Sequence, residues 1–233
     1  MLRALNPRIL LSLGALACLH GCATGAGLEG EFGRNDDPGD GDARSFDERL
    51  TSRVSLSVEG DGVAGSGLHL TAASLTDDVS VEVDLGVTDG AVTVSLEEDG
   101  ATGERLALHD LTLTAEDVEV AASIVPPGGI LLTGLSMVLE RPASAAVGWH
   151  TDDGLGADAS LSVEVHWAVE LESGTVDLAP IRMPSLPFDV TVEDDGQGRL
   201  VAHLRASSAG AFWSWAGIFE LRDLELDLIA LSD

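Results

Sequence analysis

Cysteine, lysine and tyrosine are scarce or absent in this chain of 233 residues. Its two cysteines, Cys18 and Cys22, both lie near the N-terminus, and the sequence contains no lysine and no tyrosine. The sequence from Ala23 onward has no cysteine, which excludes a disulfide framework and a cysteine-ligated zinc site there. A folded domain in this part of the chain must therefore depend on its hydrophobic core.

Positive charge is also scarce. Twelve arginines stand against forty Asp and Glu residues, which gives a formal net charge of −28 at pH 7. A nucleic-acid-binding protein needs a basic stripe, and an interfacial membrane helix needs cations opposite anionic headgroups. The composition therefore predicts no nucleic-acid partner. The acidity fits salt adaptation, in which repelling carboxylates keep a protein dispersed, and it equally fits ordinary solubility.

Sequence motifs of catalysis and metal binding are missing as well. The sequence has no Gly-x-Ser-x-Gly elbow and no His-Glu-x-x-His pair. His69, His109, His166 and His203 fall on separate expected strands. Carboxylate pairs adjoin Asp-Gly turns, where nothing buries them enough to separate their pKa values. We therefore expect no enzyme activity, no cofactor and no metal site.

The chain begins with a short apolar leader. Residues 1–8 carry Arg3 and Arg8, residues 9–19 are apolar, and Leu19-His20-Gly21-Cys22 follows. A transmembrane helix needs about 20 apolar residues, and this run is shorter. Residues 1–21 are therefore predicted to be a signal peptide that is removed, as in secretion generally.

The end of this leader resembles the signal peptides of bacterial lipoproteins. In that family a leucine three residues before the cysteine and a small residue just before it allow diacylglycerol to be attached to the thiol. Leu19, Gly21 and Cys22 match this pattern, whereas His20 departs from the small or apolar residue usually found between them. Cys18 is a competing site that lacks the leucine at this offset, and ordinary secretory cleavage is the alternative.

The resemblance implies a lipoprotein that carries acyl chains such as palmitate on Cys22. Its location would be the cell envelope, at the outer membrane or the cell surface, with the membrane as a partner through the N-terminal anchor. Residues 22–50 are rich in glycine and acidic residues, and the segment around Asp36 and Asp37 has few large apolar residues. We expect this segment to be a flexible tether with a reach of about 30 Å.

Residues 51–233 are predicted to form a single all-β domain. Apolar residues alternate with polar ones in several segments, most clearly from Leu161 to Leu171, which is typical of antiparallel sheet with one wet face. Asp-Gly pairs lie between these segments and indicate hairpins. Because the strands are long, we expect a strongly curved sheet or barrel, with a β-sandwich as the alternative and almost no helix.

Two irregularities refine this prediction. The apolar parity switches within three segments, which predicts β-bulges at His109-Asp110, Thr133-Gly134 and Arg222-Asp223. Pro180, Pro184 and Pro187 make residues 180–187 a poor central strand, because proline has no N–H to donate.

Four of the nine aromatic residues, Phe212, Trp213, Trp215 and Phe219, are clustered. In a regular strand Trp213 and Trp215 share one face and Phe212 lies on the other. These rings either plug the barrel or line an apolar pocket, which Trp149 and Trp167 would join. Two functions follow: a structural or protein-interaction domain displayed at the membrane, whose partner the sequence does not identify, or a binding module for a lipid or other apolar small molecule.

Overall fold

The structure, a computed structural model, describes residues 44–58, 66–100, 103–125, 128–171 and 174–233. All of them belong to one compact unit that spans residues 42–233. The elements in chain order are α1 (Phe46–Leu50), β1 (Val54–Val58), β2 (Gly67–Ser74), β3 (Ser80–Asp99), β4 (Gly103–Ala115), β5 (Val118–Val120), β6 (Ile130–Leu139), β7 (Ala143–Thr151), β8 (Gly154–Leu171), β9 (Gly174–Asp177), β10 (Ile181–Asp194), β11 (Leu200–Trp215) and β12 (Phe219–Leu231). The all-β, antiparallel prediction is confirmed.

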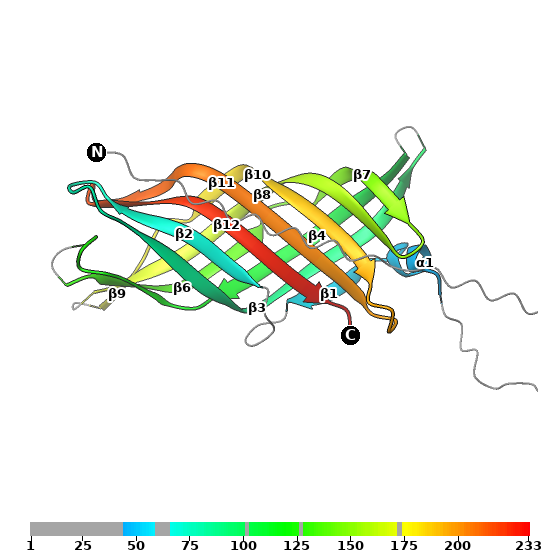
Figure 1. Cartoon of the computed structure of the whole chain (residues 1–233), viewed down its shortest axis with the longest axis horizontal. Coiled ribbons are helices and arrows are strands. Elements are labelled where there is room, and N and C mark those ends of the chain that lie inside the picture. The colour runs from blue at the N-terminus through cyan, green and yellow to red at the C-terminus, as the bar shows by residue number, and fades with distance from the viewer. Residues whose placement is uncertain (1–43, 59–65, 101–102, 126–127, 172–173) are drawn as a thin grey trace, which may run out of the picture. The chain divides into compact units, whose positions relative to one another are not determined.

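The strands form one antiparallel sheet of twelve strands that closes into a barrel (Figure 1). β1 and β2 both pair with β3 and β12, one after the other along these strands, and β6 and β7 both pair with β4 and β8 in the same way. β4 and β5 pair with successive parts of β6, and β9 and β10 pair with successive parts of β8. Four pairs of strands thus share a position, so that the twelve strands occupy eight positions around the barrel.

The barrel carries its apolar side chains inside and its charged side chains outside. On β3, Val83 and Leu85 are buried while the alternating Glu82 and Asp84 are exposed, which is the alternation that the sequence predicts. A barrel that spans a membrane has the opposite arrangement, with an apolar outer band and a polar lumen. The hydrophobic core of this protein is therefore the barrel interior.

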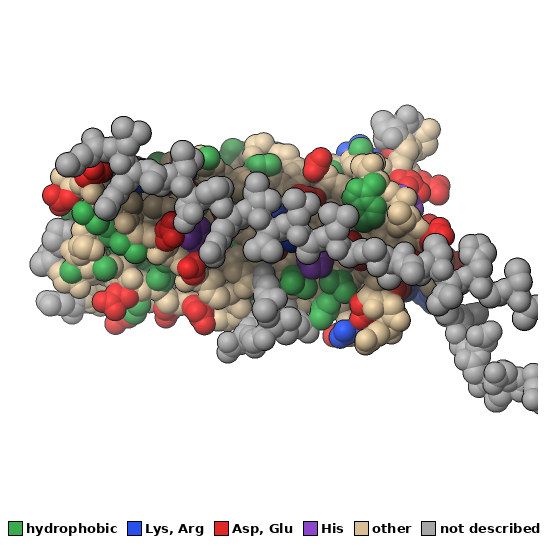
Figure 2. All heavy atoms as spheres, viewed as in Figure 1, with side chains coloured by type: hydrophobic (Ala, Val, Ile, Leu, Met, Phe, Trp, Pro, Cys, Tyr) green, Lys and Arg blue, Asp and Glu red, His purple; other side chains and the backbone are tan. Residues whose placement is uncertain are grey.

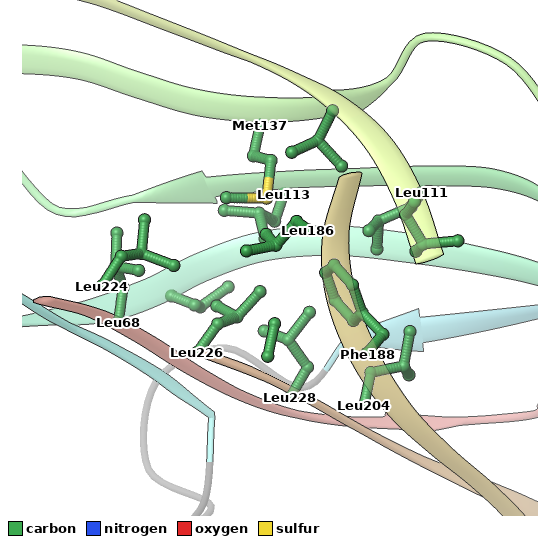
Figure 3. Packing of buried hydrophobic residues seen from close by; sticks show 14 of the residues in the cluster. Leu68, Leu111, Leu113, Met137, Leu186, Phe188, Leu204, Leu224, Leu226 and Leu228 are labelled. Atoms are coloured by element: carbon green, nitrogen blue, oxygen red, sulfur yellow. The ribbon is translucent and has the colours of Figure 1, made fainter. Parts of the chain in front are cut away.

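Side chains fill this interior (Figure 3). Leucines from β2, β4, β11 and β12 point toward one another together with Met137 and Phe188. Leu111, Leu204 and Leu228 have no exposed surface at all, so no space large enough for a water molecule touches them. An eight-stranded barrel is just wide enough for side chains to fill. The interior is therefore a packed core, and each fully buried leucine contributes about 1.5–3 kcal/mol to stability.

Helix α1 corrects the prediction that residues up to 50 form a tether. Ser45 caps this helix through a reciprocal pair of hydrogen bonds with Glu48, and Phe46 and Leu50 are buried in the hydrophobic core. Arg49 forms an ion pair with Asp194, and its Nη1 donates to the carbonyl oxygen of Gly198 at 2.9 Å. The capping box was present in the sequence. The predicted signal peptide, Cys22 and the rest of the tether up to residue 43 lie outside the described residues.

All three predicted bulges are confirmed. The β3–β4 register shifts between Thr93 and Val94, opposite His109, and the β6–β8 register shifts between Thr133 and Ser136. The β12–β2 register shifts after Arg222, where Asp223 has a φ of 55°, a conformation that few non-glycine residues adopt. These bulges bend long strands so that the sheet can close.

No helix in the described part of the chain is long and apolar enough to cross a membrane.

Candidate functional site at the open end of the barrel

The two ends of the barrel differ. At the end beside α1 the β10–β11 and β3–β4 ladders extend to the ends of their strands, whereas at the opposite end the β10–β11 ladder stops at Phe188 and Ala206 and the β3–β4 ladder stops at Val87 and Ala115. Beyond these points the sheet divides into a first lip of β2, β3, β11 and β12 and a second lip of β5, β6, β8 and β9. We call the space between the lips the mouth, which lies at the left in Figure 1.

Proline explains one of the two divisions. The β10–β11 ladder stops where β10 reaches Pro187 and Pro184, which have no N–H to donate to β11. On the other side, β10 continues to pair with β8 as far as Ile181, with an irregularity between Met183 and Leu186. The prediction that residues 180–187 make a poor central strand is thus confirmed, because this part of β10 is paired on one side.

Exposed apolar side chains gather at the mouth. Among the described residues, five large hydrophobic side chains are exposed, and four of them lie on the lips: Leu75, Val79, Val81 and Val176. The fifth, Trp149, lies on β7. Figure 2 shows hydrophobic side chains gathered at this end of the barrel, with acidic side chains beside them.

Three of the four mouth residues are on the inward face of the sheet. Val79 and Val81 alternate in step with the buried Val83, and Val176 lies opposite the buried Val169 in the β8–β9 ladder. In a closed barrel such side chains are covered by the strands across from them. The apolar lining of this barrel therefore continues past the point where the barrel stops being closed.

A cluster of aromatic rings forms the inner part of the mouth. Trp167 and Trp213 pack edge to face with ring centroids 4.8 Å apart, and Trp213 packs on Phe219 at 5.3 Å in the same way. Trp215 lies 6.0 Å from Phe219, and Phe212 lies 6.5 Å from Trp167. Phe219 is fully buried, while Phe212, Trp213 and Trp215 are half-buried against the core.

The structure corrects two expectations about these rings. Phe212 does not lie on the face opposite Trp213, because the register of β11 shifts on both sides of Ala211 and brings both rings against Trp167. Trp149 does not join the cluster, since its ring covers Gly156 on β8, where a Cβ atom would lie 2.1 Å from the indole Nε1. Trp167 does join it, as predicted.

A cavity of about 660 Å³ lies between the lips. Its apolar lining comes from Val125, Ile130 and Leu171 on one side and from Trp215 and Ile218 on the other. Of the predicted ligand residues, Trp215 is the one that lines this cavity. The turn before β6 was missed as part of the site, although the apolar pair Ile124-Val125 is visible in the sequence.

The border of the mouth is acidic. Carboxylates are supplied by the β2–β3 hairpin, β3, β5, β8 and β9, namely Asp77, Asp78, Glu82, Glu119, Glu170 and Asp177. Glu119 and Glu170 also line the cavity. The arginines on neighbouring strands already have partners, since Arg182 contacts Glu164 at 3.0 Å and Arg222 contacts Glu220 at 3.7 Å. The mouth therefore combines an apolar surface with a negative border.

A larger hollow, of about 860 Å³, is lined by residues of β2, β3, β8, β10, β11 and β12 and includes none of the rings of the aromatic cluster. Its lining combines exposed charged side chains such as Asp84 and Arg205 with core residues such as Leu68 and Phe188. His69 contacts Asp84 at 2.6 Å, and this hydrogen bond raises the pKa of the imidazole. No group of three His, Asp or Glu residues in the described ranges is placed to hold a metal ion. We therefore take the smaller mouth as the candidate site.

The chain matches no known family model and no curated protein. Among solved structures it is similar to Ail, the attachment invasion locus protein of Yersinia pestis, whose crystal structure is a complex with the heparin analogue sucrose octasulfate. The TM-score is 0.41 and the sequence identity 6%, over 77% of this chain and 97% of that chain. The similarity concerns the course of the strands alone.

Proposed function

We propose that this protein is a non-catalytic lipoprotein of the cell envelope, anchored through acyl chains on Cys22, whose barrel offers the mouth as a surface for a protein partner. The leader ending in Leu19-His20-Gly21-Cys22 supports the anchor. The described chain enters the barrel beside α1, at the end opposite the mouth.

The exposure of inward-facing valines on both lips is the observation that carries this proposal. Val81 on the first lip is 39% exposed and Val176 on the second is 47% exposed. Apolar side chains clustered at one end of a protein with a polar border are typical of an interaction site. A partner that enters between the lips covers both of them.

The character of the mouth favours a protein partner. The barrel interior is filled, so a ligand inside it has no room. The exposed apolar side chains are spread over both lips, as in the core of a protein interface, and the acidic border excludes an acidic partner. We expect the partner to present apolar side chains at the centre of the contact and basic ones around them.

A second candidate is an apolar small-molecule ligand held in the cavity between the lips. Its volume of about 660 Å³ is within the usual range for ligand sites, and Trp215 supplies an aromatic wall. Native mass spectrometry of the purified protein tests this alternative. A co-purified lipid or other apolar molecule, lost on replacement of Trp215 by glutamate, would favour the ligand over a protein partner.

Site-specific photocrosslinking tests the main proposal. A photoreactive amino acid placed at Val81 or Val176, in cells that produce the full chain, should give the same discrete crosslinked protein from both lips. Trp149 is the matched control, because it is exposed to 44% but lies away from the mouth. Equal crosslinking from Trp149, or none from either lip, would contradict the proposal.

A further inference from the structure

The division between β10 and β11 leaves one long strand edge without a neighbouring strand. β11 pairs with β12 along its whole length, up to Trp215 and Phe219. On its other side it pairs with β10 up to Ala206. The structure places no strand beside residues 207–215 on this side in the described part of the chain. The N–H of Gly210 already donates to Oδ1 of Asp223 at 3.0 Å. The other backbone groups that point along such an edge can pair with an added strand.

The two edges that face this division are not equivalent. The edge formed by residues 180–187 contains three prolines and is a poor template for a ladder. Residues 207–215 contain no proline. The irregularities around Ala211 are the feature of this edge that limits pairing, because each bulge interrupts a regular ladder. The edge of β11 is therefore the one that can accept an added strand.

A cavity for side chains lies beside this edge. It has a volume of about 320 Å³ and lies between the proline-rich part of β10 and β11. Its apolar lining comes from Ile181, Met183, Leu186 and Phe212, and Ser208 lines it from β11. Phe212 connects it to the aromatic cluster through its contact with Trp167. A strand that pairs with β11 can direct every second side chain toward this cavity.

We infer that the partner binds by adding an extended segment to the edge of β11 at residues 207–213, with apolar side chains directed into this cavity. This inference rests on the proposed function and specifies its partner as an extended, alternating apolar and basic segment. Main-chain hydrogen bonds give affinity in this mode, and pockets for alternate side chains give specificity. Basic residues on the outer face of the segment suit a protein with a formal charge of −28.

A synthetic peptide tests the inference on the full-length chain. The probe alternates valine and lysine over the length of residues 207–213, and its control has the same sequence with N-methyl groups on alternate amides. The control keeps charge and composition but cannot complete the ladder. We expect the probe to protect from hydrogen exchange those amides of residues 207–213 that point away from β12, and the N-methylated peptide to bind at least about tenfold more weakly. Equal binding of the two peptides, or none at millimolar concentration, overturns the inference.

Two serines on different strands provide matched variants. Ser208 lines the cavity, whereas Ser55 is exposed on β1 and lies opposite Thr93 on β3, outside the edge of β11. Ser208→Trp fills the cavity and should weaken probe binding by at least about tenfold, while Ser55→Trp should change it by less than about twofold. Circular dichroism establishes that each variant is folded. The comparison with the N-methylated peptide uses the wild-type protein and therefore does not depend on the folding of any variant. Equal effects of the two substitutions overturn the inference.

The remaining outcomes separate this inference from the proposed function. Crosslinking from Val81 that persists unchanged in Ser208→Trp leaves the mouth as an interaction site but overturns strand addition. Probe binding without any crosslinking from the lips overturns the proposed protein partner at the mouth but leaves the edge of β11 as a site for an added strand. A concentration-dependent dimer that Ser208→Trp abolishes, seen by analytical ultracentrifugation, makes a second copy of this chain the occupant and overturns the assignment to a partner.

Discussion

His150 on β7 joins the barrel wall to helix α1, because its Nε2 lies 2.8 Å from Oδ1 of Asp47. Its other ring nitrogen, Nδ1, lies 2.7 Å from Oε2 of Glu104 on β4. A ring with a carboxylate on each nitrogen satisfies both contacts when both nitrogens carry protons. The hydrogen bond to Glu104 raises the pKa of His150 above 6.5, the hydrogen bond to Asp47 raises it further, and partial burial opposes both.

This contact predicts that α1 loosens as the pH rises through the raised pKa of His150. A folded-state pKa above the unfolded value means that the stabilisation is complete below pH 6.5 and is lost as the pH rises through the raised pKa. We expect the melting temperature to fall over that window and His150→Asn to reduce this dependence, while the part that comes from the His69–Asp84 contact remains. His203→Asn, on β11, is the control. A wild-type profile that matches His150→Asn at every pH would show that the contact does not stabilise the fold.

The other connection of α1 depends on pH in the opposite direction. The backbone N–H of Gly196 lowers the pKa of Asp194 below 3.8, and the Arg49 guanidinium lowers it further. Stabilisation by this carboxylate is present above its unfolded pKa of 3.8 and is lost as the pH falls through the lowered value. The acid and alkaline effects therefore occupy separate pH ranges, so the His150 prediction can be measured without interference from Asp194.

The aromatic cluster predicts a sharp contrast between two tryptophans. Trp213 packs edge to face on both Trp167 and Phe219, whereas Trp149 is 44% exposed. Trp213→Ala should lower the free energy of unfolding by about 3 kcal/mol, and Trp149→Ala by about 1 kcal/mol or less. Denaturant unfolding measures both values. A cost for Trp213→Ala no larger than that for Trp149→Ala would mean that the cluster adds little to the core.

Local pattern in the sequence predicted the strands and their defects. The period of two predicts which side chains face inward, and the parity switch at Arg222-Asp223 predicts a bulge. Pro184 lies in the part of β10 that has no ladder with β11. Each of these effects acts within a few residues, which is why a short segment of sequence shows it. Closure of the barrel and its division into lips depend on which strand edges meet, and no short segment encodes that. For this reason the sequence does not predict the mouth, although the period of two in this segment includes Val79 and Val81.

The misplaced residues have equally physical causes. Phe212 was assigned to the wrong face because the register shifts beside Ala211 change the alternation of β11, and Gly210 before them has a φ of 91°. Trp149 was grouped with the other tryptophans because its contact with Gly156 depends on the pairing of β7 with β8. Helix α1 is acidic like the segment that precedes it, so composition does not distinguish the two, and the capping box of Ser45 and Glu48 is the local signal of the helix.

Gly156 and Trp149 should be energetically coupled. The Cβ atom of an alanine at Gly156 would lie 2.1 Å from Nε1 of Trp149, and an exposed ring can move away. Gly156→Ala should therefore destabilise the wild-type protein by about 1 kcal/mol through loss of this packing, and it should be neutral or stabilising in a Trp149→Ala background. A double-mutant cycle measures the coupling. Additive effects of the two substitutions would show that the ring does not rest on Gly156 in solution.

Lipidation of Cys22 is the prediction on which the location of the protein depends. One acyl chain binds a bilayer only marginally, at about 0.8 kcal/mol per buried methylene group, whereas two chains hold a protein stably. Full-length protein should incorporate a labelled palmitate analogue and stay with the membrane pellet after a carbonate wash. Cys22→Ala should lose the label, and Cys18→Ala, which removes the competing thiol and leaves Leu19-His20-Gly21-Cys22 intact, should keep both properties.

The label is the decisive measurement, because an uncleaved apolar leader can itself retain Cys22→Ala in the membrane. Label that survives in Cys22→Ala but disappears in Cys18→Ala would move the anchor to Cys18, and an unlabelled wild-type protein would leave ordinary secretion as the explanation of the leader.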